Sequence, residues 1–162
     1  KQFVIIGDLN WITYKEIFPM LKDNEIWLGY SSVKEFTQPD GTIKKFGNKL
    51  WYTNLDIQKR HEKLILWQRY YDDDGNPLPD VQERYPHYDN YDAINVDRVA
   101  DIPVDYQGVM GVPITFLNGY NPEQFKIITM STMSGKSANY WSMLKGKSKY
   151  SRIFITKAQE GV

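Results

Sequence analysis

Basic and aromatic side chains lie close together in residues 41–71, and this combination suits a surface that binds nucleic acid. Ammonium and guanidinium groups bind phosphates, and aromatic rings stack on unpaired or extruded bases. Trp51 and Tyr52 follow Lys44, Lys45 and Lys49 at short range, and they are the aromatic pair that we single out. Packing in the core is the competing interpretation for any single Trp or Tyr, because large aromatic residues dominate protein cores.

The net charge of zero hides a segregation of charge along the chain. Residues 41–71 carry seven bases against two acids, a balance of +5, and residues 124–159 carry seven bases and no acid. Residues 72–123, between them, hold eleven acids against two arginines. If the two basic stretches converge in space, they form a surface that attracts phosphates. The alternative is a set of solvated faces whose charges balance one another.

Other motifs that could carry chemistry are weak. Residues 134–137, Ser-Gly-Lys-Ser, imitate the end of a phosphate-binding loop, but the upstream glycine of that loop is absent. The acids of residues 72–74 lack the alternation and the closing Glu of a calcium loop, so a solvated turn fits them better. The chain has no Cys, and His61 and His87 cannot make a convincing zinc site, so we expect no metal.

The elements that must position these residues begin with an apparent αβ repeat. We predict a strand at about residues 2–7, a helix at about 12–22 that Pro19 shortens or kinks, and a strand at 25–30. Strand, helix and strand in this order are typical of a mainly parallel sheet. We then predict a hairpin whose arms, residues 42–46 and 49–55, flank a turn at Gly47 and Asn48. Residues 38–41, Gln-Pro-Asp-Gly, are a further strong turn signal.

The second half of the chain has fewer regular signals. Residues 64–67 favour a strand in the core, and residues 72–77 form an acidic turn that is the best candidate for a structural break. Two further strands are expected at 125–130 and 151–156, separated by a basic excursion that forms a mobile loop or a long hairpin. Residues 85–117, rich in Tyr, Asp and Pro, suit an ordered, loop-rich segment rather than one long helix.

Length and composition indicate one globular core with an optional appendage. No apolar run approaches the roughly 20 residues of a membrane span, and no signal peptide is visible, so we expect a soluble, intracellular protein without membrane partners. The chain opens with Lys1 and enters an apolar run directly, from which we infer a piece of a longer protein.

Three segments in this order resemble the carboxyl-terminal half of the EcoRI-type adenine-specific DNA methyltransferases. They are residues 4–30, residues 49–62 and residues 85–117, and the likeness spans most of the chain. The most specific parts read TYKEIFP, YTNLD, YDAINV and GVMGVPITF. The resemblance implies transfer of a methyl group from S-adenosylmethionine to N6 of adenine in double-stranded DNA, usually in a restriction-modification system of the bacterial cytoplasm.

The chain departs from this family pattern in one respect. The family carries a glycine-containing cofactor loop and an Asn-Pro-Pro-Phe tetrapeptide, both upstream of the strand that reads VIIG, and neither is present here. No catalytic residue is therefore expected in this chain, and the cofactor site should lie mostly outside it. A stand-alone, non-catalytic nucleic-acid-binding module is the main alternative, and an aromatic-rich carbohydrate-binding domain is a third that the charge segregation disfavours.

The residue patterns and the resemblance together give one model of the chain. Residues 1–71 would be the carboxyl-terminal part of a Rossmann-like methyltransferase sheet with an antiparallel hairpin, and residues 72–162 a β-rich extension for target recognition. Residues 85–117 would be a structural connector that sets the flanking basic stretches in place. Trp51 or Tyr52 would hold the extruded adenine by stacking. The predicted phosphate contacts are Lys44, Lys45, Lys59, Arg60, Lys136, Lys145, Lys147 and Lys149.

Overall fold

The computed structural model describes residues 1–133 and 141–158, and these residues form a mixed α/β structure with several sheets and few helices. The chain divides into two compact units, residues 1–62 and residues 63–162. The domain boundary expected after residue 71 stays a prediction. Lys136 lies outside the described residues, as does the Ser-Gly-Lys-Ser motif.

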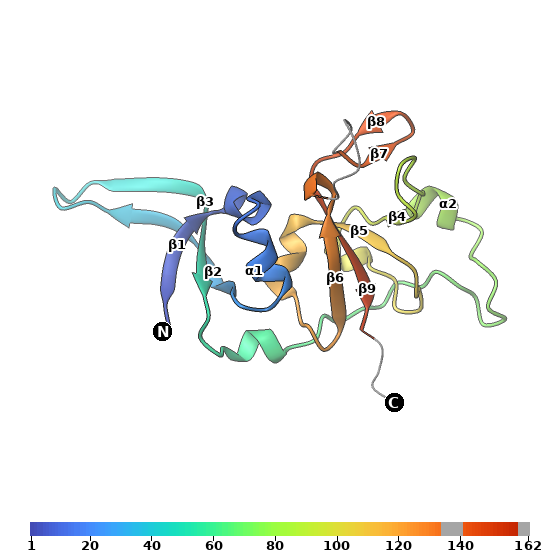
Figure 1. The fold of residues 1–162 in the computed structure, drawn as a ribbon, viewed down its shortest axis with the longest axis horizontal. Coiled ribbons are helices and arrows are strands. Elements are labelled where there is room, and N and C mark those ends of the chain that lie inside the picture. The colour runs from blue at the N-terminus through green and yellow to red at the C-terminus, as the bar shows by residue number, and fades with distance from the viewer. Residues whose placement is uncertain (134–140, 159–162) are drawn as a thin grey trace. The chain divides into compact units, whose positions relative to one another are not determined.

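The first unit contains a three-stranded sheet with short helices (Figure 1). Its elements are β1 (Val4–Asp8), the 3₁₀ helix η1 (Leu9–Thr13), α1 (Phe18–Lys22), β2 (Trp27–Thr37), β3 (Ile43–Thr53) and the 3₁₀ helix η2 (Gln58–His61). The strand order is β1-β3-β2, and both pairings are antiparallel. The mainly parallel sheet expected from the order strand, helix, strand is therefore not formed within this unit, because β3 lies between β1 and β2 and is antiparallel to both. β1 and β2 nevertheless run in the same direction, because each is antiparallel to β3.

The predicted strands at 2–7 and 25–30 are confirmed as β1 and the start of β2, whereas the helix predicted at 12–22 is broken in two. The Asp8 side chain caps η1 by accepting a hydrogen bond from the Asn10 N–H at 2.9 Å. Pro19 lies in the first turn of α1, where its missing N–H costs nothing. The proline thus starts a new helix instead of kinking a long one.

The hairpin turn predicted at Gly47 and Asn48 is wrong, because β3 runs through both residues. The turn lies at residues 38–41, where the Gly41 N–H donates to the Gln38 carbonyl at 2.9 Å and Gly41 has a φ of +81°. Gly47 and Asn48 instead lie where the pairing of β2 with β3 changes register, between Val33 and Glu35 of β2. A glycine inside a strand pattern here marks a bulge.

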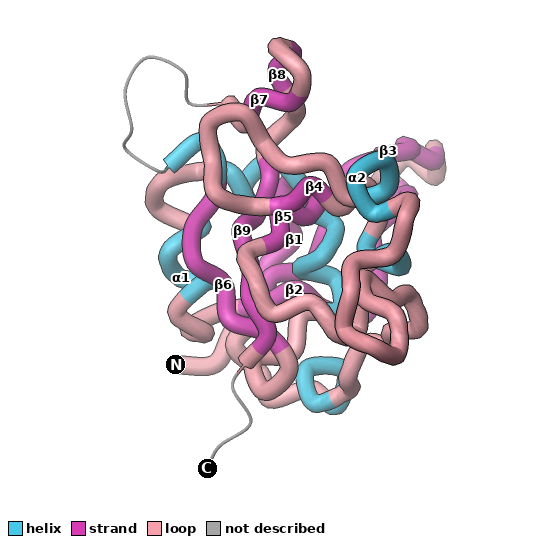
Figure 2. The backbone as a smooth tube through the Cα atoms, turned by 90° about the vertical axis from the view of Figure 1, so that its right-hand side faces the viewer, coloured by secondary structure: helices cyan, strands magenta, loops and turns pink. Residues whose placement is uncertain are grey.

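The second unit contains a four-stranded sheet of order β4-β5-β9-β6, with β4 parallel to β5 and the other pairs antiparallel (Figure 2). Its elements are α2 (Val81–Arg84), β4 (Ile94–Asn95), η3 (Val99–Asp101), β5 (Met110–Pro113), η4 (Ile114–Gly119), β6 (Phe125–Met130), η5 (Ser131–Met133), β7 (Met143–Leu144), β8 (Lys147–Ser148) and β9 (Arg152–Lys157). The strands predicted at 125–130 and 151–156 are confirmed, as is the loop-rich character of residues 85–117.

The core of the second unit is apolar and centred on the sheet. Its most deeply buried side chains are Ile94, Val96, Ile102, Met110, Val112, Phe116, Phe125, Met130, Ile153 and Ile155. β7 and β8 form a separate small hairpin, which is the form that the second part of the basic excursion takes. The acidic turn at residues 72–77 is confirmed, with Gly75 at a φ of +82°.

The core strand predicted at residues 64–67 is wrong. The Gln124 side chain, rather than a strand, bonds the Leu64 backbone, accepting from its N–H at 2.7 Å and donating to its carbonyl at 2.8 Å. Further along, Gln68 forms an isolated bridge with Pro103, in which the Gln68 carbonyl accepts from the Val104 N–H at 2.8 Å. Ile65 and Trp67 point outward, with 91% and 66% of their surfaces exposed. The segment alternates as a strand does, but it lacks a ladder partner.

Candidate nucleic-acid interface

Lys44 and Lys45 lie on β3, on the part of that strand that extends past β1. Both are exposed, and consecutive strand residues point to opposite faces. Lys44 pairs across the strands with Phe36, and its ammonium lies 5.5 Å from the centroid of the Phe46 ring. Phe36 and Phe46 themselves meet edge to face at 5.4 Å. The two lysines are thus presented on an ordered β-ribbon with an aromatic face.

A cavity of about 460 Å³ opens at the carboxyl end of β1, and it shares Phe36 and Lys49 with the foot of this ribbon. The Lys49 ammonium lies 2.8 Å from the Asp8 carboxylate, which lines the same cavity. Hydrogen bonds from Lys49 and from the Asn10 N–H lower the pKa of Asp8. The remaining lining residues are Ile6, Gly7, Asn10, Trp11 and Tyr14. Sequence reasoning did not single out this aromatic and polar set, although the polar run after an apolar strand marks it.

Trp51 and Tyr52 occupy opposite faces of the first sheet. Tyr52 is buried, its hydroxyl donates to the Asp8 carbonyl at 2.8 Å, and its ring lies 5.7 Å from that of Trp11. Burial, with a smaller effect of the Asp8 charge, raises the pKa of the Tyr52 hydroxyl. Trp51 is half-buried and packs across the sheet against Gly29. Trp51 is therefore the member of the pair with a side chain open to a ligand.

Lys59 and Arg60 are engaged within the first unit. The Lys59 ammonium donates to the Gly29 carbonyl at 3.0 Å, and burial lowers its pKa. The Arg60 guanidinium lies 3.6 Å from the centroid of the Trp27 ring and donates to the Asn24 side chain at 3.1 Å. A stacked and hydrogen-bonded arginine stabilises the local fold. Phosphate contact at either residue would have to compete with these interactions.

Lys145, Lys147 and Lys149 belong to the β7–β8 hairpin and the residue after it. The Asp89 carboxylate holds the hairpin turn, since it accepts from the Lys145 N–H at 3.2 Å and from the Gly146 N–H at 2.7 Å. The carboxylate bonds the backbone and leaves the side chains of Lys145 and Lys147 exposed. An acid from residues 85–117 therefore fixes the position of this basic turn, as the connector model expects.

Asp97 joins the acidic segment to the last basic stretch. Its Oδ1 accepts from Asn95 at 2.9 Å and from Arg152 at 3.2 Å, and lies 3.6 Å from the Lys149 ammonium. The Asn95 hydrogen bond is the main reason why the pKa of Asp97 is lowered, and the charges of Lys149 and Arg152 add to it. Arg152 is buried, so Asp97 compensates a charge inside the unit. Lys149 is partly committed to this network, unlike its two neighbours on the hairpin.

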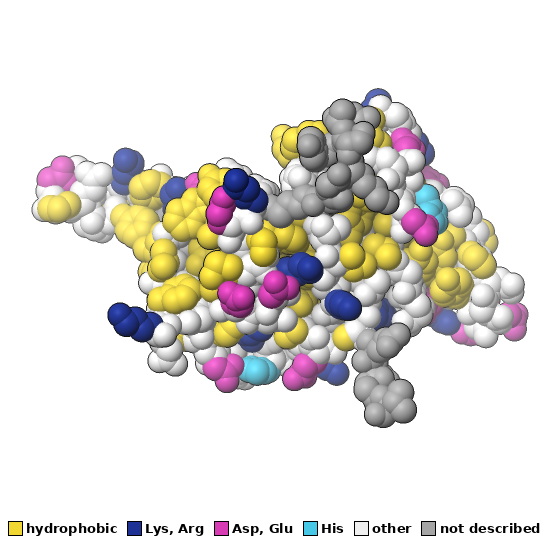
Figure 3. Space-filling model, in the orientation of Figure 1, with side chains coloured by type: hydrophobic (Ala, Val, Ile, Leu, Met, Phe, Trp, Pro, Cys, Tyr) yellow, Lys and Arg dark blue, Asp and Glu magenta, His cyan; other side chains and the backbone are white. Residues whose placement is uncertain are grey.

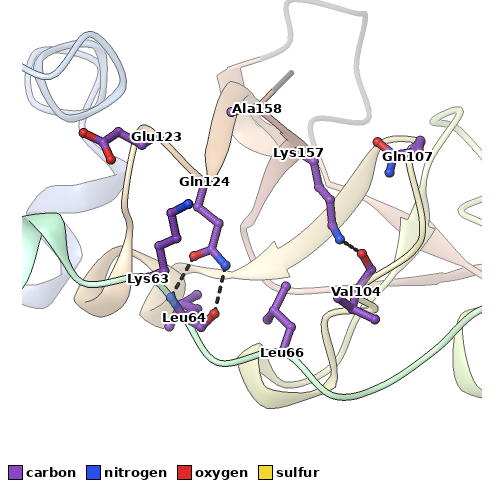
Figure 4. Close-up of a pocket in the computed structure, with 9 residues that line it drawn as sticks. All are labelled: Lys63, Leu64, Leu66, Val104, Gln107, Glu123, Gln124, Lys157 and Ala158. Carbon is purple, nitrogen blue, oxygen red and sulfur yellow. Dashed lines mark hydrogen bonds between the residues drawn. The ribbon is translucent and has the colours of Figure 1, made fainter. Parts of the chain in front are cut away.

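A second cavity, of about 650 Å³, lies in the second unit (Figure 4). Its walls carry the ammonium groups of Lys63 and Lys157, together with the Glu123 carboxylate. Lys157 donates to the Val104 carbonyl, and the Gln124 amide bonds the Leu64 backbone. Burial lowers the pKa of Lys157. Two of the polar groups in this wall thus bond the protein itself, which makes the cavity less suited to bind an anion than the exposed hairpins.

The part of the chain that the structure describes holds no group of three or more His, Asp or Glu residues that could bind a metal ion. Nor does any helix within residues 1–133 and 141–158 combine the length and apolar character needed to cross a membrane.

For this mixed α/β chain with exposed basic hairpins, comparison with known protein families gives the class: adenine-specific methyltransferase. Residues 1–159 match the family model described as adenine-specific methyltransferase EcoRI, and the chain belongs to this family. The family predicted from the sequence is therefore confirmed.

Curated relatives give the same family. The chain is 45% identical over 173 residues to the type II methyltransferase M.EcoRI of Escherichia coli, covering 96% of this chain and 50% of that protein. It is 31% identical over 191 residues to the type II methyltransferase M.MpnI of Mycoplasma pneumoniae, covering 98% of this chain and 57% of that protein. The chain thus spans about half the length of the curated relatives that it matches. No solved structure was found to match it.

Proposed function

We propose that this chain is part of an S-adenosylmethionine-dependent DNA methyltransferase that modifies N6 of adenine, and that it contributes DNA binding and target recognition. The observation that carries the proposal is the family match over residues 1–159. The exposed lysines of the two hairpins add physical support, because neutralising phosphates is the main source of affinity for DNA. Double-stranded DNA is the partner, in a bacterial restriction-modification system.

The fold supports a place at the end of a larger Rossmann-like sheet. β1 and β2 run in the same direction with η1 and α1 between them, and β3 closes the gap as the antiparallel strand. Val4 and Ile5 of β1 point to opposite faces, and about half of each side chain is exposed. Strands of parallel sheets are normally buried on both faces. We infer that residues 1–71 belong to the catalytic domain and residues 72–162 to the target-recognition part.

The cofactor would supply the methyl group, and the described glycines do not fit a loop that cradles it. A Cβ at Gly7, in the first strand, would lie 2.3 Å from the Trp11 ring, so this glycine is needed for packing. Gly41, Gly75 and Gly146 have positive φ values but lie in exposed turns with open space around them. We therefore assign no catalytic or cofactor-binding role to the described residues, and place both sites in the rest of the enzyme.

The proposed DNA contacts follow from exposure. Exposed ammonium groups belong to Lys44, Lys45, Lys145 and Lys147. Lys149 is partly exposed, and its ammonium lies 3.6 Å from the Asp97 carboxylate. Trp51 is the proposed stacking residue for the extruded adenine. Lys59 and Arg60 would contribute by supporting the Trp27 region as well as by their charge. The role of Lys136 stays a prediction from sequence.

The test uses the full-length enzyme, with Lys145→Ala, Lys147→Ala and Lys149→Ala combined in one variant. We expect weaker binding to duplex DNA and a slope of log affinity against log salt that falls by roughly 0.9 for each phosphate that is no longer neutralised. Lys126→Ala serves as the control, because Lys126 is an exposed base on β6 without an assigned contact. An unchanged slope in the triple variant refutes the phosphate role. A full-length protein that leaves adenine unmethylated refutes the enzyme and favours the stand-alone binding module.

A further inference from the structure

Residues 34–48, which we call the arm, form a two-stranded ribbon that projects past the three-stranded sheet (Figure 1). β1 pairs with β3 only from Lys49 to Thr53, so the arm has no third strand. Apart from Phe46, every arm residue is exposed. In Figure 3 the arm carries hydrophobic, basic and acidic side chains along its visible face. The arm therefore adds little to any core, which means that the fold does not explain it.

Local interactions stabilise the arm despite its exposure. At its tip the Asp40 carboxylate accepts from the Thr42 N–H at 2.9 Å and from the Thr42 hydroxyl at 2.6 Å. The Gln38 N–H donates to the Thr42 carbonyl at 2.8 Å. Nearer the sheet, the Phe36 and Phe46 rings pack together. An isolated two-stranded hairpin is marginally stable in water, so these local interactions are what keep an exposed arm in one shape.

We propose that the arm enters the major groove of duplex DNA tip first, and that its tip reads base edges. The residues assigned to reading are Gln38, Asp40 and Thr42, and those assigned to the phosphates on the two walls of the groove are Lys44 and Lys45. The proposal rests on the proposed function and extends it, because it adds base readers from the catalytic part, residues 1–71, to the target-recognition part, and it names the element and the groove.

Dimensions favour the major groove. A ribbon with side chains on both faces is about 10 Å thick, which is the spacing at which sheets pack. The major groove is about 12 Å wide and 8.5 Å deep, whereas the minor groove is only about 6 Å wide. From Glu35 to Asp40 the arm reaches about 17 Å at roughly 3.3 Å per residue. The arm is thus thin enough for the major groove, too thick for the minor groove, and long enough to reach the floor.

Charge and chemistry fit the same placement. Lys44 and Lys45 point to opposite faces of the ribbon, so each faces a different wall of phosphates when the tip lies on the groove floor. Amide, carboxylate and hydroxyl groups are the ones that read base edges, and Gln38, Asp40 and Thr42 supply one of each. The hydrogen bonds from Thr42 lower the pKa of Asp40, which keeps it ionised as an acceptor for a cytosine amino group.

A second copy of the chain is the competing occupant, because exposed ribbons also pair with one another. The outer strand of the arm carries Lys34 and Glu35, and charged residues on an edge strand oppose such pairing. Binding to DNA accounts for both the two lysines and the polar tip. A strand-pairing contact between copies would require neither.

The test uses the full-length enzyme with three variants: Gln38→Ala with Thr42→Ala at the tip, Lys44→Ala with Lys45→Ala on the faces, and Lys15→Ala as the control. Lys15 is an exposed lysine of the first unit outside the arm. Binding is measured by titration with cognate and non-cognate duplexes over a series of salt concentrations. Duplexes with 7-deazapurines alter the major groove, and duplexes with inosine for guanine alter the minor groove. The molar mass of each variant in solution is measured in parallel, because it reports whether copies of the enzyme associate.

The tip variant should lose preference for the cognate duplex, by roughly 5- to 150-fold for a good bidentate contact, and keep its non-cognate affinity. The face variant should lose affinity for both duplexes and lower the salt slope by about 1.8. Full sequence preference in the tip variant, or sensitivity to inosine alone, overturns the groove assignment while methylation continues. A change of mass with unaltered DNA binding overturns it in favour of a contact between copies. Absence of DNA binding and methylation in the unmodified enzyme refutes the proposed function instead.

Discussion

Tyr52 and Trp51 lie on opposite faces of one strand, so replacing each separately should have different effects. We expect changes at Tyr52 to lower stability and a change at Trp51 to lower base extrusion. Tyr52 is 3% exposed, packs against Trp11 and donates a hydrogen bond to the Asp8 carbonyl. Tyr52→Phe keeps the ring and removes this bond, so it should cost about 0.5–1.5 kcal/mol of unfolding free energy. Tyr52→Ala also leaves a cavity and should cost about 3–5 kcal/mol.

Trp51→Ala should have the opposite profile. Its side chain is half-buried, so the loss of apolar burial costs about 1 kcal/mol, below the value for a fully buried residue. Stacking of an aromatic ring on a base is worth about 1–3 kcal/mol, which corresponds to roughly 5- to 150-fold in the population of extruded adenine. The variant should therefore remain folded and lose extrusion.

The assay needs two measurements on the same preparation of full-length enzyme. Unfolding in urea gives the free energy, and the fluorescence of 2-aminopurine at the target adenine, together with methylation rate, reports extrusion. The reasoning is refuted if Tyr52→Phe keeps full stability and abolishes extrusion, because Tyr52 would then face the base. It is equally refuted for Trp51 if Trp51→Ala leaves fluorescence and methylation unchanged.

Two further predictions concern the second unit. Because the Asn95 hydrogen bond and neighbouring cations lower the pKa of Asp97, its stabilising effect is full above the ordinary carboxyl pKa of about 4 and is lost as pH falls through the lowered value. Urea midpoints at pH 7 and pH 3 should therefore differ less for Asp97→Asn than for the unmodified enzyme, and equal differences contradict this. Gly111→Ala puts a Cβ 2.5 Å from the Tyr88 hydroxyl and should cost about 1–3 kcal/mol. Gly47→Ala is its control, with open space around it, and a similar loss in both would contradict the steric cause.

The sequence predicted elements well where pattern and partner are both local. The strand at 125–130 alternates and pairs with β9, the other strand predicted in this region, and the acidic turn at 72–77 closes through its own backbone and side chains. Prediction failed where a partner far along the chain decides the structure. Residues 64–67 alternate like a strand, but among the described residues the contact to their backbone comes from a Gln side chain sixty residues away. No local signal distinguishes that outcome from a ladder.

The candidate interface was predictable in composition and less so in geometry. Charge counting found the lysines of both hairpins, yet it could not separate exposed Lys44 from Lys59, whose ammonium bonds the Gly29 carbonyl. It also could not choose between Trp51 and Tyr52, because neighbours in a strand differ only in face, and the face depends on what packs there. The turn lies at residues 38–41 rather than at Gly47. A glycine between two strand-like stretches is typical of a bulge as well as of a turn, so the sequence alone did not distinguish them.

The acids of residues 85–117 show how a neutral chain can still present a basic surface. Asp89 directs its charge to two backbone N–H groups of the β7–β8 turn, and Asp97 compensates the buried Arg152. Neither carboxylate forms an ion pair with Lys145 or Lys147 in the described contacts, so those ammonium groups remain available outside the network. A net charge summed over the whole chain cancels acids against bases that do not contact one another. The field that DNA would encounter therefore depends on which groups each acid bonds, and Asp89 bonds the backbone of the turn rather than the ammonium groups of its lysines.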